Sequence, residues 1–68
     1  MLTRSEEDHI KAVYALLQSG ENAFTKDIAS RLRTKASSVT DMLKKLSGKS
    51  LLKHEPYYGV KLTAKGQA

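Results

Sequence analysis

Residues 34–49 carry a regular apolar pattern around which the rest of the chain can be organised. Their apolar side chains recur at the i, i+3, i+4 and i+7 spacing of one buried helical stripe, formed by Val39, Met42, Leu43 and Leu46. Because each residue advances a helix by about 100°, the opposite face and its flanks carry Ser37, Ser38, Thr40, Asp41, Lys44 and Lys45. The segment predicts a helix that packs by one face and presents hydroxyls, then lysines, on the other.

Two further helices are predicted before this segment. The first covers residues 5–19, with Thr3 or Ser5 as its N-cap and an acidic residue three positions later, the spacing of a capping box. The second runs from an N-cap at Thr25 to about Leu32. Only a short turn separates it from the helix of residues 34–49. Two helices joined in this way are typical of a helix-turn-helix.

The pattern changes from helical spacing to alternation after Gly48. Residues 51–55 and 60–62 alternate, and the sequence Pro-Tyr-Tyr-Gly between them is typical of a turn, so we expect a β-hairpin. The inward-facing residues of this hairpin should be Leu52, His54, Val60 and Leu62. Thr63 is expected to cap a last helix of which only the first turn is present. Three helices followed by a hairpin predict a mainly α winged helix-turn-helix.

Length and apolar content limit the class of protein. A chain of 68 residues suffices for one small domain with a thin core. No apolar run reaches the length of a membrane span or of the central segment of a signal peptide, so we expect a cytoplasmic protein. No nucleophile lies near a plausible base and no glycine-rich phosphate loop is present, so nothing in the sequence indicates an enzyme.

The positive charge is concentrated in the second half of the chain. The formal net charge is +5, and residues 31–68 hold nine lysines and arginines against two acidic residues. A basic half on a small domain favours nucleic acid or another polyanion as partner, although a solvated lysine surface would have the same composition. The absence of cysteine excludes disulfides and the usual structural zinc sites.

The residue types on the predicted recognition helix suit a DNA duplex. Affinity for DNA comes mainly from cations near phosphates, and the candidates for this role are Lys44, Lys45, Lys53 and Lys61. Thr25, at a helix N-terminus, can offer its hydroxyl and nearby backbone N–H groups to a phosphate. Ala36 and Ser37 are short enough to let the start of the recognition helix approach base edges, where Lys35 can reach guanine acceptors. Five more residues complete the predicted DNA-binding set: Ser38, Thr40, Asp41, Tyr57 and Tyr58.

Several of these residues have a second interpretation. Asp41 can accept a hydrogen bond from a cytosine amino group, or it can form an i, i+4 ion pair with Lys45. The two tyrosines at the hairpin tip can bond phosphates or lie against sugars, but Tyr57 could instead fold back onto the sheet. The basic surface as a whole could dock an acidic protein partner rather than DNA.

Three sequence segments, taken together, resemble segments of one protein family. EDHIKAVYAL, ASSVTDMLKKL and LLKHEPYYGVKLTAKG together resemble the N-terminal DNA-binding domain of the diphtheria toxin repressor family, the iron- and manganese-dependent bacterial repressors. The likeness covers nearly the whole chain and is closer to the manganese branch. It implies a repressor that is activated by Mn²⁺ or Fe²⁺ and binds double-stranded DNA, at a palindromic operator, as a homodimer.

The resemblance also bears on metal binding. Asp8 matches a first-helix ligand of the manganese branch, but Lys11 stands where that branch can have a glutamate, and Tyr58 stands where an arginine is common. The family's other ligands come from a helical dimerisation domain. We therefore expect residues 1–68 to be one winged domain cut before that domain, monomeric alone and without a metal site. Asp8 would be a ligand only in a full-length parent, and the neighbouring His9 is expected to be a surface residue.

Overall fold

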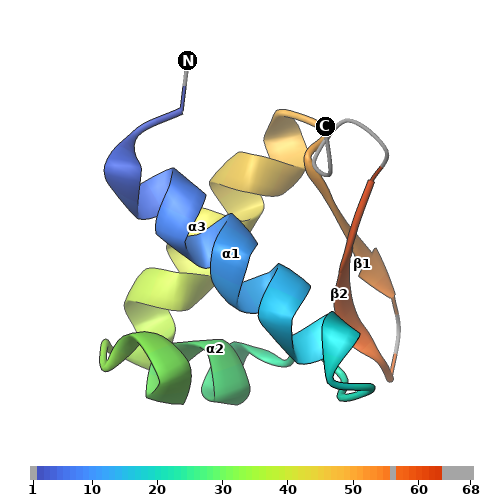
Figure 1. The fold of residues 1–68 in the computed structure, drawn as a ribbon. Coiled ribbons are helices and arrows are strands. Elements are labelled where there is room, and N and C mark those ends of the chain that lie inside the picture. Colours follow the sequence, from blue (N-terminus) through green and yellow to red (C-terminus); the bar gives the residue numbers. More distant parts are fainter. Residues whose placement is uncertain (1, 56, 64–68) are drawn as a thin grey trace.

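The computed structural model describes residues 2–55 and 57–63 (Figure 1). Within these ranges the chain forms three helices and a two-stranded antiparallel sheet, namely α1 (Arg4–Gln18), α2 (Thr25–Leu32), α3 (Ala36–Gly48), β1 (Leu52–Glu55) and β2 (Gly59–Leu62). The register pairs Leu52 with Leu62 and Glu55 with Gly59. The predicted winged helix-turn-helix is confirmed. The last helix that Thr63 was expected to cap lies outside the described residues.

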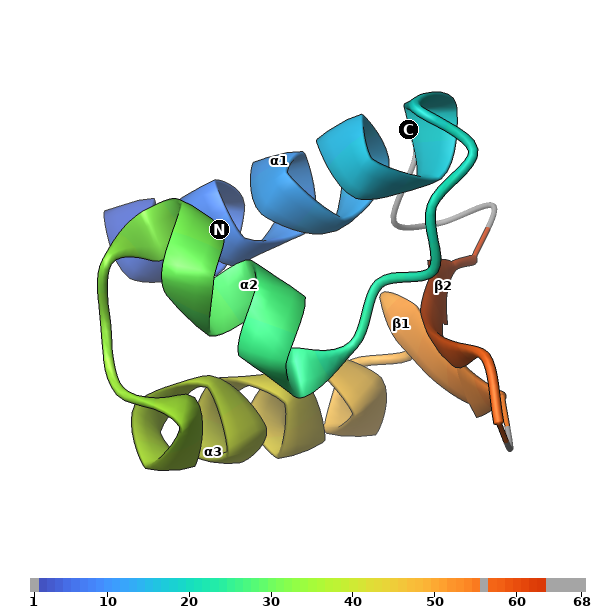
Figure 2. The same cartoon turned by 90° about the horizontal axis from the view of Figure 1, so that it is seen from below.

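The core lies where the three helices meet the hairpin. Every element contributes a buried apolar side chain, among them Val13 of α1, Ile28 of α2, Leu43 of α3, Leu52 of β1 and Val60 of β2. Figure 2 shows α1 and α3 on opposite sides of the helical body with the hairpin at one end, where α1 contacts β2 and α3 contacts β1. Burial of the apolar stripe of α3 turns the polar side of this helix away from the core.

The N-termini of the first two helices are capped differently. The Thr3 hydroxyl accepts a hydrogen bond from the Glu6 N–H at 3.1 Å, and the Glu6 carboxylate accepts one from the Thr3 N–H at 3.0 Å. This is a complete capping box, so Thr3 rather than Ser5 is the cap. The predicted cap at Thr25 is wrong. Phe24 is the N-cap of α2 and makes no side-chain capping bond, while Thr25 is the first residue inside the helix.

Both histidines differ from their predicted environments. His9 is buried, because it lies three residues after Glu6 and four before Val13 on the inner face of α1, and its Nδ1 lies 2.7 Å from the Ser5 carbonyl oxygen. His54, expected beneath the hairpin, is exposed. Towards the tip, the helices and their connections cover β2 more fully than β1. Val60 is therefore buried, while His54, which pairs with it, stays in solvent.

Candidate nucleic-acid interface

The outward face of α3 presents the polar residues that its apolar periodicity predicts. On the inner side Val39, Leu43 and Leu46 are each at most 1% exposed. The residues predicted for the opposite face and its flanks are all exposed: Ser37, Ser38, Thr40, Asp41, Lys44 and Lys45. Lys35 and Ala36, which precede them at the start of the helix, are exposed as well. The structure therefore brings seven of the predicted DNA-binding residues onto α3 and places an eighth, Lys35, at its N-cap.

The hydroxyls at the start of α3 are not equivalent. The Thr40 hydroxyl donates to the Ala36 carbonyl oxygen at 3.0 Å, one turn earlier in the same helix. In the described part of the chain, neither Ser37 nor Ser38 uses its side chain in a hydrogen bond. Lys35, the N-cap, also makes no side-chain capping bond, so the N–H groups of the first turn have no capping partner. The two serines and these N–H groups remain available to an external acceptor.

The lysines on the outward face have no anionic partner within the described residues. The ion pairs among the described residues are Glu6–Lys49 and Lys53–Glu55, and neither lies on the outward face. The alternative pairing of Asp41 with Lys45 is therefore not present, although both residues lie one turn apart on the same helix. Lys44 and Lys45 therefore have no ion-pair partner to give up when a ligand binds, whereas the ammonium group of Lys53 lies 3.8 Å from the carboxylate of Glu55.

An ion pair between the exposed Lys49 and the buried Glu6 connects the end of α3 to the start of α1. The Nζ of Lys49, the C-cap of α3, donates to a carboxylate oxygen of Glu6 at 2.5 Å, and the Glu6 side chain is 1% exposed. The hydrogen bond from Lys49, followed by the one from the Thr3 N–H, lowers the pKa of Glu6 to about 2. This pair was not predicted from the sequence, because the capping-box spacing explains Glu6 locally and gives no sign of a partner 43 residues away.

The hairpin tip and the start of α2 lie on the same side of the molecule as α3. In Figure 2 all three lie along the lower edge of the molecule, away from α1. At the tip Tyr57 is 93% exposed and Tyr58 57% exposed, and Lys61 is exposed on β2. The alternative in which Tyr57 folds back onto the sheet is therefore wrong. Thr25 is half-buried at the first position of α2.

Comparison with known proteins agrees with this geometry. Residues 1–60 match the family model described as the iron dependent repressor, N-terminal DNA binding domain. The chain belongs to the iron dependent repressor family. This confirms the resemblance found in the sequence, and it places the chain in a family of transcriptional repressors rather than in an enzyme family.

Relatives of the repressor family match along nearly the whole chain. The HTH-type transcriptional regulator MntR of Lysinibacillus sphaericus is 43% identical over 67 residues, which is 98% of this chain and 48% of the relative. MntR of Bacillus subtilis is 42% identical over 67 residues, covering 98% and 47%, and MntR of Listeria welshimeri is 42% identical over 66 residues, covering 97% and 46%. The chain spans about half the length of the curated relatives it matches.

The family's name implies a metal, but the described residues of this chain do not by themselves form a site for one. Asp8 is exposed on α1. Among residues 2–55 and 57–63, no three histidine, cysteine, aspartate or glutamate side chains lie close enough together to hold an ion. Hard divalent cations take six or more oxygen ligands, so Asp8 would need donors that this part of the protein does not supply.

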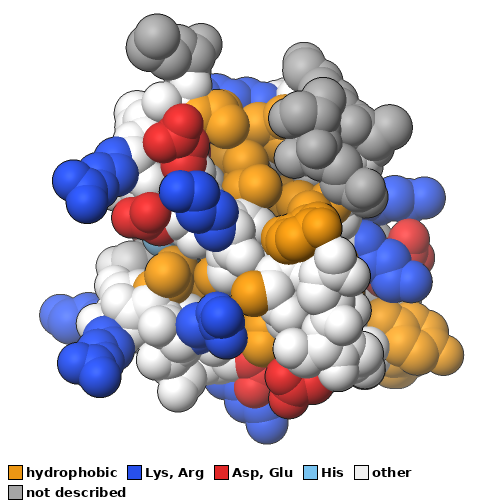
Figure 3. Space-filling model, viewed as in Figure 1, with side chains coloured by type: hydrophobic (Ala, Val, Ile, Leu, Met, Phe, Trp, Pro, Cys, Tyr) orange, Lys and Arg blue, Asp and Glu red, His pale blue; other side chains and the backbone are white. Residues whose placement is uncertain are grey.

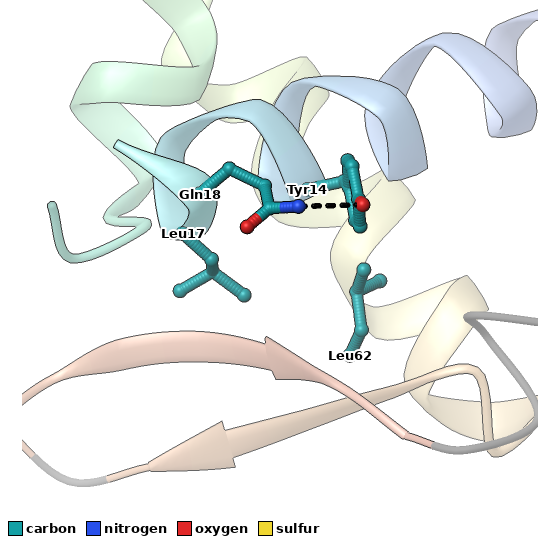
Figure 4. Close-up of a pocket in the computed structure, with 4 residues that line it drawn as sticks. All are labelled: Tyr14, Leu17, Gln18 and Leu62. Atoms are coloured by element: carbon teal, nitrogen blue, oxygen red, sulfur yellow. Dashed lines mark hydrogen bonds between the residues drawn. The ribbon is translucent and has the colours of Figure 1, made fainter. Parts of the chain in front are cut away.

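The surface of α1 is less uniform than that of α3. Figure 3 shows apolar, basic and acidic side chains together on the face dominated by α1. A shallow pocket of about 220 Å³ lies between α1 and β2, lined by Tyr14, Leu17, Gln18 and Leu62, and the Gln18 amide donates to the Tyr14 hydroxyl at 2.6 Å (Figure 4). None of these lining residues is charged or belongs to α3. No helix in the described ranges is long and apolar enough to cross a membrane.

Proposed function

We propose that this domain reads the operator of a manganese- or iron-dependent transcriptional repressor. The observation that carries the proposal is the outward face of α3, where exposed serines precede two exposed lysines that have no ion-pair partner among the described residues. A helix of this kind fits the major groove, because short side chains let its start approach base edges while the lysines near its end reach phosphates.

Each predicted residue has a role in such a complex. Base edges would be approached by Lys35, Ala36, Ser37 and Ser38, and the Asp41 carboxylate would accept a hydrogen bond from a cytosine amino group. Phosphates would be contacted by Lys44 and Lys45, by Lys61 and Lys53 of the wing, and by Thr25 with the uncapped N–H groups of α2. Thr40, whose hydroxyl is bonded within α3, would contribute packing at the flank. Tyr57 and Tyr58 would contact the duplex from the wing.

Metal control and dimerisation belong to a full-length parent protein. Asp8 would supply one ligand for Mn²⁺ or Fe²⁺ there, together with donors from a second domain. Two copies of the parent would bind the two half-sites of a palindromic operator in the bacterial cytoplasm, because a two-fold dimer presents its two recognition helices one turn of DNA apart or a multiple of it. The 68-residue chain alone would be a monomer that binds one half-site weakly.

Duplex selection followed by a salt series tests the proposal. The 68-residue chain is used to enrich binding sequences from a pool of random duplexes, and the enriched duplex is then titrated by fluorescence anisotropy at several salt concentrations. The affinity should fall steeply as salt rises, because each neutralised phosphate releases counterions. A common enriched sequence is expected. Absence of binding at low salt, or binding that salt does not weaken, would refute DNA as the ligand.

Two variants separate DNA from an acidic protein partner. Ser37→Ala should change which duplexes are enriched, because a serine that approaches base edges takes part in reading them. A surface that only docks acidic proteins would enrich no sequence, and the variant would then have no effect on selection. Lys11→Gln serves as the control, since Lys11 is exposed on α1 and its loss should leave both the enriched sequence and the salt dependence unchanged.

A further inference from the structure

The wing tip holds a large aromatic residue in a backbone conformation that disfavours it. The Tyr58 N–H donates to the Glu55 carbonyl oxygen at 3.1 Å and closes a four-residue turn. The third residue of this turn is Tyr57, with φ of +70°, a value at which glycine or asparagine is usual. The Tyr57 side chain is 93% exposed and makes no hydrogen bond among the described residues. Among the described residues, Tyr57 therefore has no hydrogen bond and little burial to offset the strain of its positive φ.

The wing rests on the connection between α1 and α2 at Gly59, the first residue of β2 after the tip. Gly59 has φ of +85°, and a Cβ at this position would lie 2.3 Å from the carbonyl oxygen of Ala23 and 2.7 Å from its carbonyl carbon. Ala23 is fully buried, and its carbonyl oxygen accepts a hydrogen bond from the Val60 N–H at 3.0 Å. Only glycine permits this approach of one backbone to another.

This contact fixes the wing relative to the helix-turn-helix. Ala23 is followed directly by Phe24, the N-cap of α2, and α2 packs against α3. A wing seated on Ala23 is therefore held in the same rigid unit as the recognition helix. Figure 2 shows the outcome, with the hairpin tip extending to the same side as α3.

We propose that Gly59 is a positioning residue for DNA binding. It lets the wing pack against Ala23, and this packing places Tyr57 next to the DNA duplex whose groove α3 enters. The inference rests on the proposed function and assigns the wing contact to a sequence-independent role. The phenol hydroxyl of Tyr57 donates to a backbone phosphate oxygen while its ring lies against deoxyribose, contacts that position a protein without reading bases. Residues held in unfavourable backbone conformations cluster at functional sites, where the strain is part of how the site works.

Tyr57→Gly tests the contact, because stability and binding should move in different directions. Glycine relieves the positive φ, so the thermal midpoint should stay level or rise. Affinity for a short labelled duplex of mixed sequence at low salt should fall about fivefold, the factor that one net hydrogen bond of about 1 kcal/mol provides. Tyr57→Phe should keep the midpoint and lose the part of the affinity that the hydroxyl supplies. If Tyr57→Gly binds the duplex as well as the wild type does, the inference is overturned.

Gly59→Ala tests the positioning role, with Gly20→Ala as its matched control. Gly20 has φ of +80°, but a Cβ added there would meet nothing within 4 Å, so its alanine variant carries the strain without the collision with Ala23. Gly20→Ala should bind the duplex as the wild type does. Gly59→Ala, measured under conditions where circular dichroism shows a folded chain, should bind more weakly, and adding Tyr57→Gly should cost little more. Full additivity of the two losses would contradict the positioning role.

Hydrogen exchange in the wild type supplies a readout that needs no destabilised variant. If the wing must be seated on Ala23 to contact DNA, binding of the mixed-sequence duplex must in turn stabilise that seating. The Val60 amide, which donates to Ala23, should exchange more slowly in the complex, and this slowing should be absent in Tyr57→Gly. Unchanged exchange in the wild-type complex would overturn the inference alone, whereas a wild type that binds no duplex would overturn the proposed function itself.

Discussion

The two faces of α3 differ in what the rest of the chain does with them. On the inner face Leu43 is 1% exposed and packs in the core, while Lys44, the next residue, is exposed on the outer face. No described residue forms an ion pair with Lys44 or Lys45. One helix thus supplies stability from one side and an unsatisfied charged surface from the other. Substitutions on the two faces should therefore affect different measurements.

The lysines of the same segment repeat this contrast over a few residues. Lys49, at the C-cap, donates to the buried carboxylate of Glu6 and belongs to the folded framework. Lys44 and Lys45 lie one turn earlier and contact no carboxylate among the described residues. Counting positive charge along the sequence cannot distinguish these two groups, whereas the structure separates a lysine that supports the fold from lysines that are available to a phosphate.

The largest effect is expected at Leu43. Leu43→Ala should lower the free energy of unfolding by about 2–5 kcal/mol, because it removes buried apolar contacts and leaves a cavity. A domain of this size gains only about 3–5 kcal/mol from its core, so the variant should be largely unfolded at physiological temperature. Urea unfolding followed by circular dichroism measures the change. Lys44→Ala is the control and should stay within about 0.5 kcal/mol of the wild type; equal losses would mean that the two faces are not distinct.

The next effect concerns the ion pair of Glu6 and its dependence on pH. Folding lowers the pKa of Glu6 from 4.5 to about 2, so the folded state holds the carboxylate ionised where the unfolded chain would bind a proton. The resulting stabilisation is fully present above pH 4.5 and is lost as pH falls from 4.5 towards 2. Urea midpoints measured across this range should fall in the wild type. Glu6→Gln should be less stable at neutral pH and should lack this component of the acid loss; a parallel pH profile in both chains would contradict the assignment.

The elements could be predicted from the sequence because their signals are local. Spacing of apolar residues was enough to find α3 and the rotation that exposes its polar face, and alternation around Pro-Tyr-Tyr-Gly was enough to find the hairpin. His54 was placed wrongly, because alternation identifies a face but does not say how far the helices cover it. His9 was placed wrongly, because it was judged as an isolated polar residue rather than by its position between Glu6 and Val13.

The missed features all depend on contacts between distant segments. The ion pair joins Glu6 and Lys49, which are 43 positions apart, and the backbone contact joins Ala23 and Gly59, which are 36 positions apart. Neither pair has a local sequence pattern. The candidate interface was easier to predict, since six of its residues follow from the single helical period of α3.

Removal of the two outer lysines should change binding and leave stability in place. The slope of log affinity against log salt is negative. Lys44→Gln and Lys45→Gln should each make it shallower by about 0.9, because each variant gives up one phosphate contact. The urea midpoint should hardly move, since neither lysine has a partner among the described residues. Anisotropy titrations of one duplex at several salt concentrations give the slope. Lys49→Gln should have the opposite effect on the two measurements. It should lower the urea midpoint and keep the salt slope of the wild type.

The smallest effect is expected at Asp41, where the charge on the outer face has the wrong sign for a phosphate. Asp41→Asn should raise affinity for a duplex of mixed sequence slightly, because it removes repulsion from the backbone. It should also reduce the preference for one C·G pair in the enriched site by about 1 kcal/mol, because the carboxylate is the acceptor suited to a cytosine amino group. Competition between the enriched duplex and single-pair variants measures this preference. If Asp41→Asn tightens binding to every duplex equally, Asp41 faces the phosphates, and the outer face of α3 lies on the DNA backbone rather than in the groove.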